Sequence, residues 1–283
     1  MSWQLFTAIS VFSLAASVLL QRVLLSKDKL DPYAYVVVFQ ATVGVILTVV
    51  ALFVGFKLPN IEQYLLPAIV SIIAFGLGHI AYAKTLQLVE ASAFSVLFAT
   101  QAVWIMLFGI LFFNESLTLI QVLGTTLIFA SVLLLVKRLS ALQFDQGTLF
   151  GLLTGMLFGV AILCWSYVGR YTDPISWAAI SFIATAFVAY VVRPNTISKM
   201  PQLFTGKILP KLIVLGVLYA IGSLTMLYAY RKGTFSIVTP LRQTSIIVTV
   251  ILALIFLKAE RNRIPRKLIA SALCFFGVVL IVI

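Results

Sequence analysis

The sequence predicts an all-α integral membrane protein with ten transmembrane helices, arranged as two inverted five-helix repeats around a central cavity. Three observations support this fold class. Of the 283 residues, 62% are hydrophobic and only 10% are charged, and the mean hydropathy is +1.15, as is typical of a polytopic membrane protein. Ten apolar stretches are long enough, or nearly so, to cross about 30 Å of hydrocarbon as helices. The two halves of the chain also resemble each other.

Polar breaks that combine charge with Pro, Gly or Asn separate the apolar stretches, and such residues end helices. All eight acidic residues lie near the ends of these stretches, so we expect none inside the membrane. The first ten residues lack the basic region and cleavage pattern of a signal peptide, so the first stretch is expected to be retained. The predicted spans are residues 3–25, 34–56, 65–86, 91–113, 117–136, 147–168, 174–192, 210–230, 235–257 and 267–283.

Internal similarity predicts a repeat-built protein. Three short matches occur in the same order in both halves: residues 82–83 with 228–229, 93–96 with 234–237, and 128–136 with 274–282. Because each half holds an odd number of predicted spans, the halves must have opposite orientations in the membrane. We therefore expect a first repeat at 1–137, a linker at 138–146 and a second repeat at 147–283, together forming one membrane domain.

The basic residues predict the orientation. In the ten-span arrangement fifteen Lys and Arg residues fall on one side and four on the other. The positive-inside rule places the basic side in the cytoplasm and both termini outside it. The protein is thus expected in the plasma membrane, which is the inner membrane in a bacterium.

Other protein classes receive little support. The net charge of +12 comes from basic residues scattered over short loops, so we expect no nucleic-acid partner. Cys164 and Cys274 each lie within an apolar run and predict neither a disulfide nor a metal site. No nucleophile–base pair, metal-ligand spacing or phosphate-binding glycine loop is evident. We expect no enzyme activity, no cofactor and no metal.

Several motifs within the two repeats resemble a known family. They are Tyr82-Ala83, Asn114 to Thr118, Gly124 with residues 130–133, residues 227–230, Glu260 and residues 277–279. Together, and over nearly the whole chain, they resemble the drug/metabolite transporter superfamily and more narrowly the EamA-type transporters. This resemblance implies secondary transport of a small metabolite, often export, by alternating access about a central cavity.

The chain also departs from its relatives. Ten-span members are commonly described with both termini in the cytosol, which the charge count opposes. Four-span multidrug exporters of the superfamily use a glutamate in the first span, where this chain offers only Ser10, Ser13 and Ser17. Antiport of protons and cationic drugs through such a carboxylate is therefore not expected.

Arg242 is the sharpest candidate for a functional residue. It follows Pro240 and precedes Gln243 in the span at 235–257, and an arginine at this depth costs about 2.5–3.5 kcal/mol on insertion scales. With no acid in the membrane, its partners would be carbonyl groups, water or a bound anion, and guanidinium groups bind carboxylates and phosphates well. Alternatively, Arg242 extends to the membrane interface or stacks on an aromatic ring.

Further polar and aromatic residues within the spans are candidates for the same cavity. Gln101 would face Arg242 if the repeats are aligned on residues 94–95 and 235–236; alignment on the two glutamates that end these spans places Ile246 there instead. His79 could carry a proton or serve only in packing. We expect substrate contacts from Arg242, Gln243, Gln101, His79, Tyr82, Trp104, Trp165, Tyr219 and Ser223.

Other residues have structural interpretations. We expect Trp3, Trp177 and Tyr167 to lie in interface belts. Gly151, Gly155 and Gly159 should form a small-residue ridge for close helix packing.

The sequence therefore predicts a secondary transporter, exporter or exchanger, of a small organic metabolite such as an amino acid or related carboxylate. Its partners would be an anionic small molecule and the bilayer, and the chain would act as a monomer. One alternative is a flippase or carrier for a phosphate-bearing lipid or sugar. Another is a non-transporting membrane assembly subunit, which would have a solid core.

Overall fold

The computed structural model describes residues 2–58, 60, 62–113, 118–135, 145–232, 235–257 and 261–282. Within these ranges the regular structure is entirely helical. The α-helices are α1 (Trp3–Arg22), α2 (Pro32–Val54), α3 (Leu65–Leu88), α4 (Ala91–Ala99), α5 (Gln101–Phe113), α6 (Leu119–Leu135), α7 (Gln146–Tyr171), α8 (Pro174–Val192), α9 (Leu209–Lys232), α10 (Phe235–Phe256) and α11 (Ile264–Val282). A π-helical turn, η1 (Val23–Lys27), extends α1, and two 3₁₀ segments, η2 (Glu62–Tyr64) and η4 (Pro194–Phe204), precede α3 and α9.

Every predicted span coincides with helical structure, with one internal break. The span predicted at 91–113 consists of α4 and α5, which are separated at Thr100. The Thr100 side chain donates a hydrogen bond to the carbonyl of Leu97, 2.7 Å away, and such back-bonding bends helices. Among the described residues, seven helices are long and apolar enough to cross a membrane, and three shorter apolar helices accompany them. The linker predicted at 138–146 falls mostly outside the described residues.

Local sequence explains where several helices begin. Asp31, Asp145 and Asp173 cap α2, α7 and α8, each accepting hydrogen bonds from backbone N–H groups of the first turn. Pro32 and Pro174 follow at the first helical position, where proline loses no hydrogen bond. These three acidic residues thus mark the starts of helices.

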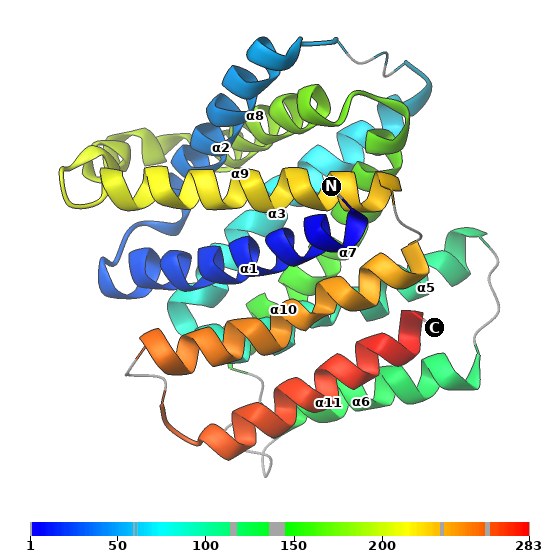
Figure 1. The fold of residues 1–283 in the computed structure, drawn as a ribbon. Helices are drawn as coiled ribbons and strands as arrows, with labels where there is room; N and C mark the ends of the chain where they lie inside the picture. The colour runs from blue at the N-terminus through cyan, green and yellow to red at the C-terminus, as the bar shows by residue number, and fades with distance from the viewer. Residues whose placement is uncertain are drawn as a thin grey trace.

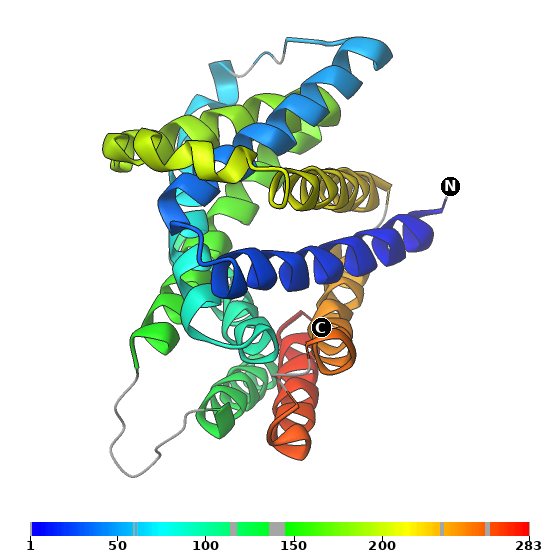
Figure 2. The same ribbon diagram turned by 90° about the vertical axis from the view of Figure 1, so that its left-hand side faces the viewer.

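The helices form stacked layers around a common interior. In both views α2 and α8 lie on one side, α9 and then α1 follow, and α10 and α11 lie on the other side (Figures 1 and 2). The main packing pairs are α3 with α7, α2 with α8, α6 with α11, and α1 with α9. The N- and C-termini lie at the same end of the helices (Figure 1).

The outward surface is apolar. Large side chains such as Phe53, Leu66 and Phe256 are 88%, 74% and 68% exposed, whereas soluble proteins rarely expose wide apolar patches. With the long apolar helices, this surface fits a bilayer rather than water. The structure is thus that of an all-α integral membrane protein.

Glycines set the closest helix approaches. The ridge predicted on α7 packs against α4 and α5: a Cβ on Gly151 would meet Leu97, one on Gly155 would meet Thr100, and one on Gly159 would meet Trp104. The small-residue ridge is therefore a packing surface, as predicted. The packing brings α7 against the chain on both sides of the α4–α5 break.

One interface expectation is wrong. Trp177 is fully buried, and its Nε1 donates a hydrogen bond to the carbonyl oxygen of Trp165, 3.1 Å away. The residue lies near the start of α8, where packing against α7 encloses it. Tyr167 is about half exposed (47%) and Trp3 is partly buried, which leaves the interface prediction open for these two.

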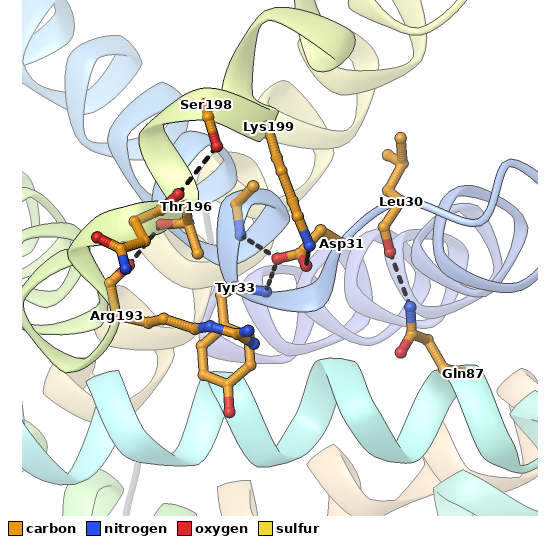
Figure 3. Close-up of polar contacts among 10 residues, drawn as sticks. Leu30, Asp31, Tyr33, Gln87, Arg193, Thr196, Ser198 and Lys199 are labelled. Carbon is orange, nitrogen blue, oxygen red and sulfur yellow. Dashed lines mark hydrogen bonds and ion pairs between the residues drawn. The ribbon is translucent and has the colours of Figure 1, made fainter.

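Polar contacts hold the two halves together at one end. The Asp31 carboxylate caps α2 and forms an ion pair with Lys199 of η4 at 2.7 Å, while the Arg193 guanidinium lies 4.9 Å above the Tyr33 ring (Figure 3). Burial raises the pKa of Asp31, but hydrogen bonds and the charge of Lys199 lower it by more, so it lies below its usual value. Asp28 and Lys211 form a second such pair at 2.7 Å.

Candidate functional site

A cavity of about 140 Å³ lies within the described part of the bundle, lined by residues of α1, α2, α3, α4, α5, α7, α8, α9 and α10. Its walls therefore come from both halves of the chain. Of these helices, α2 and α8 lie on one side of the layered bundle and α10 lies on the other (Figures 1 and 2). Drug-sized pockets measure about 300–1,000 Å³. The volume of this cavity is below that range.

Arg242 of α10 lines this cavity and is partly buried. Among the described lining residues it is the only Lys or Arg, and none is Asp or Glu. Its Nη1 donates a long hydrogen bond of 3.4 Å to the hydroxyl of Tyr230 on α9. This tyrosine hydroxyl is a partner beyond the carbonyl groups, water or anion that the sequence predicts for Arg242.

Aromatic rings occupy the middle of the lining. His79 of α3 is buried, with its ring centre 4.8 Å from that of Phe158 and about 6 Å from those of Phe75, Tyr82 and Tyr219. Burial among aromatic rings favours the packing role for His79. The rings also give the cavity apolar side walls.

Tyr82 belongs to a buried hydrogen-bond chain between three helices. Its hydroxyl accepts from Nε2 of Gln21 at 3.3 Å, and the hydroxyl of Tyr35 donates to Oε1 of the same glutamine at 3.0 Å. Gln21 is thus satisfied through both its amide nitrogen and its amide oxygen, although it lies in the apolar interior. These two hydrogen bonds hold α1, α2 and α3 together.

Several other polar atoms of the lining have no such partner. Gln40 of α2 is fully buried, and neither its Nε2 nor its Oε1 makes a hydrogen bond within the described structure. Oε1 of Gln101 and Oγ of Ser166 are likewise buried and unpaired there. Burying a polar group without a partner costs about 1–3 kcal/mol, so these three residues are candidates for contacts with a bound molecule.

The structure brings together seven of the nine residues predicted to contact substrate. The cavity is lined by Arg242, Gln101, His79, Tyr82, Trp165, Tyr219 and Ser223. Trp104 is not among the lining residues, because it packs beside Gly159 and stacks on Phe108. The side chains of Gln243 and Pro240 lie outside the described residues.

Sequence reasoning missed Gln40 and Ser166. Gln40 carried a detectable signal, because it is the only Gln, Asn or charged residue within the predicted span 34–56, and buried polar residues in membranes are costly. Ser166 carried no such signal, since serine is common in transmembrane helices and usually bonds to its own backbone.

Long apolar helices around a cavity with polar lining residues define this molecule as a multi-pass membrane protein. Residues 1–137 and again 145–283 match the EamA-like transporter family. The chain belongs to that family, as the sequence motifs predicted.

Two further similarities bear on the fold and the repeat. An uncharacterized protein of Methanocaldococcus jannaschii is 30% identical over 137 residues, which cover 48% of this chain and 96% of that protein. A chain of a solved crystal structure is 17% identical and superposes with a TM-score of 0.66 over 97% of both chains. The second likeness shows a shared fold.

Proposed function

We propose that this protein is a secondary transporter of a small organic metabolite with an anionic group, such as an amino acid or related carboxylate, and that it acts by alternating access as an exporter or exchanger. The cavity is the observation that carries the proposal. Residues of both halves line it, and Arg242 is the one Lys or Arg among its described lining residues. A guanidinium can bind a carboxylate through two parallel, charge-assisted hydrogen bonds.

Inverted five-helix repeats, in ten membrane-crossing segments, belong to this proposal. In such a repeat, α1 corresponds to α7, α2 to α8, α3 to α9 and α6 to α11. Replacing each helix by its counterpart in the other half then converts the α1–α9 pair into the α7–α3 pair. The same exchange leaves the α2–α8 and α6–α11 pairs unchanged, and all four pairs occur. The family match in two successive halves and the half-length archaeal relative also support a duplication.

Alternating access would use the contacts at the end of the bundle shown in Figure 3. The pairs Asp31–Lys199 and Asp28–Lys211 each join the first half of the chain to the second. Opening the cavity at this end requires these contacts to break. Because the basic residues gather here, we place this end in the cytoplasm and both termini outside it. A reporter that is active only in the cytoplasm, fused after Ile283, should stay inactive; activity would refute this orientation.

The experiment that tests the transport proposal is uptake of labelled amino acids and other small carboxylates into proteoliposomes. Arg242→Ala should reduce transport of the carboxylate cargo at least about tenfold, because a buried charged hydrogen bond contributes about 1.5–3 kcal/mol. Arg231→Ala is a matched control, since Arg231 is exposed at the end of α9. Equal transport by the Arg242 variant would remove Arg242 from the site.

The alternative of a phosphate-bearing lipid or sugar cargo calls for more than one basic residue around the cavity. The described lining has one, and its volume of about 140 Å³ is small. A non-transporting subunit was expected to have a solid core. The presence of a cavity, its small volume and its single basic lining residue favour a small metabolite as the cargo.

A further inference from the structure

We infer that Gln40 and Ser166 form a second, uncharged binding pole, and that the cargo is a small carboxylate with a primary amide at its other end. This inference rests on the proposed function, because it takes Arg242 as the contact for the carboxylate. It adds the chemical class of the opposite end of the cargo.

The first step is the position of the two poles. Gln40 lies on α2, whose packing partners are α8, α9 and α3, whereas Arg242 lies on α10, which packs against α1, α11 and α4. Both side chains line the same cavity. In both views α9 and α1 separate the layer that contains α2 from α10 (Figures 1 and 2). A cargo that touches both residues must therefore present two different groups.

The second step is the chemistry of the Gln40 pole. A carboxamide offers two N–H donors and a carbonyl acceptor side by side. On Gln40 the donor and the acceptor atoms are both buried and without a partner in the described structure. Another primary amide can satisfy both at once, because its acceptor and donor meet them in a paired arrangement. The Ser166 hydroxyl supplies one more contact from α7.

The charges of the lining residues favour the same class of cargo, a carboxylate with an uncharged amide. Among the described lining residues there is no Asp or Glu that could neutralise a cationic group. A second ammonium at the far end of the cargo, as in lysine, would be buried without an acidic partner, at high cost. An uncharged amide avoids this cost and uses the unpaired atoms.

Gln21 provides an internal comparison. It is also a buried glutamine, 1% exposed, yet its amide oxygen and nitrogen are bonded to Tyr35 and Tyr82. Gln21 therefore stabilises the empty protein, whereas Gln40 destabilises it until a cargo binds. Replacing each glutamine by leucine should have opposite effects.

The test measures thermal unfolding of the purified full-length protein in detergent, with and without two matched pairs of compounds. L-Asparagine is compared with L-leucine, and succinamate with 4-methylpentanoate; in each pair the amide is replaced by a hydrocarbon of similar shape. In the wild type the amide compounds should raise the unfolding temperature at concentrations at least about tenfold lower than their hydrocarbon partners, because a site with unpaired polar groups rejects apolar analogues.

The variants complete the test. Without ligand, Gln40→Leu should raise the unfolding temperature and Gln21→Leu should lower it. Gln40→Leu should also abolish the preference for amides, and Ser166→Ala should reduce it. A lower unfolding temperature for unliganded Gln40→Leu, equal responses to both members of each pair, or no response to any of the four compounds would overturn the inference.

Arg242→Ala separates this inference from the proposed function. If the hydrocarbon compounds act as well as the amides and lose their effect in Arg242→Ala, the carboxylate site stands and the amide pole is wrong. If amide preference depends on Gln40 but persists in Arg242→Ala, the amide pole stands and the proposed carboxylate contact fails.

Discussion

Gly124→Ala and Gly277→Ala should each destabilise the protein, because these glycines let α6 and α11 touch through their backbones. A Cβ on Gly124 would lie 2.5 Å from the carbonyl oxygen of Gly277, and a Cβ on Gly277 would lie 2.7 Å from that of Gly124. Comfortable contacts begin near 3.5 Å, so the helices must separate by about 1 Å. Neither atom can rotate away, because both carbonyls are part of helices.

The expected loss is about 1–3 kcal/mol for each single variant, the usual range for overpacking in a tight interface. Alanine favours helix over glycine by about 0.5–1 kcal/mol, which offsets part of this loss. The double variant should lose less stability than the sum of the two single losses, because the helix separation caused by the first methyl group makes room for the second.

The assay is unfolding in mixed micelles of dodecyl maltoside and increasing SDS, followed by circular dichroism. Gly206→Ala is the control, because a Cβ there would meet nothing within 4 Å, so its stability should be unchanged. The reasoning is refuted if Gly124→Ala unfolds at the same SDS fraction as Gly206→Ala, or if the two single losses add fully in the double variant.

Three further predictions concern other contacts. Asp31→Asn keeps a capping side chain but loses the charge that faces Lys199; with Lys199 48% exposed, the loss should stay below about 1 kcal/mol. The pKa of Asp31 in the folded protein lies below its usual value of 3.8. Its ionised form therefore stabilises the fold above about pH 4, and this contribution is lost as the pH falls through the folded pKa. Measurements of unfolding free energy against pH should show this loss in the wild type and not in Asp31→Asn. Gly155→Ala should destabilise the protein by about 1–3 kcal/mol, because the new Cβ would clash with Oγ1 of Thr100. Adding Thr100→Ala should restore much of the lost stability, and a double variant without any recovery would contradict the contact. Ser10→Ala removes a buried 2.7 Å hydrogen bond to the carbonyl of Gly222, so α1–α9 packing should weaken by about 0.6 kcal/mol; a more stable variant in the same SDS assay would contradict it.

The class of protein and the approximate positions of the helices follow from the sequence alone, apart from the break at Thr100. Both depend on local properties: apolar length decides whether a segment can cross a bilayer, and residues such as Asp31 with Pro32 start a helix wherever it packs. The family followed from short motifs, and the family match confirms it. Arg242 could be singled out for the same local reason, because a charge within an apolar run is costly in any packing.

Only the tertiary structure decided which faces of the helices meet. In a membrane protein the outward face is as apolar as the interior, so periodicity does not distinguish a buried face from a lipid-facing one. The sequence therefore predicts an interface position for Trp177, which is fully buried, and a cavity position for Trp104, which packs beside Gly159. The unpaired state of Gln40 depends on which groups surround it, and those groups come from helices far apart in the chain.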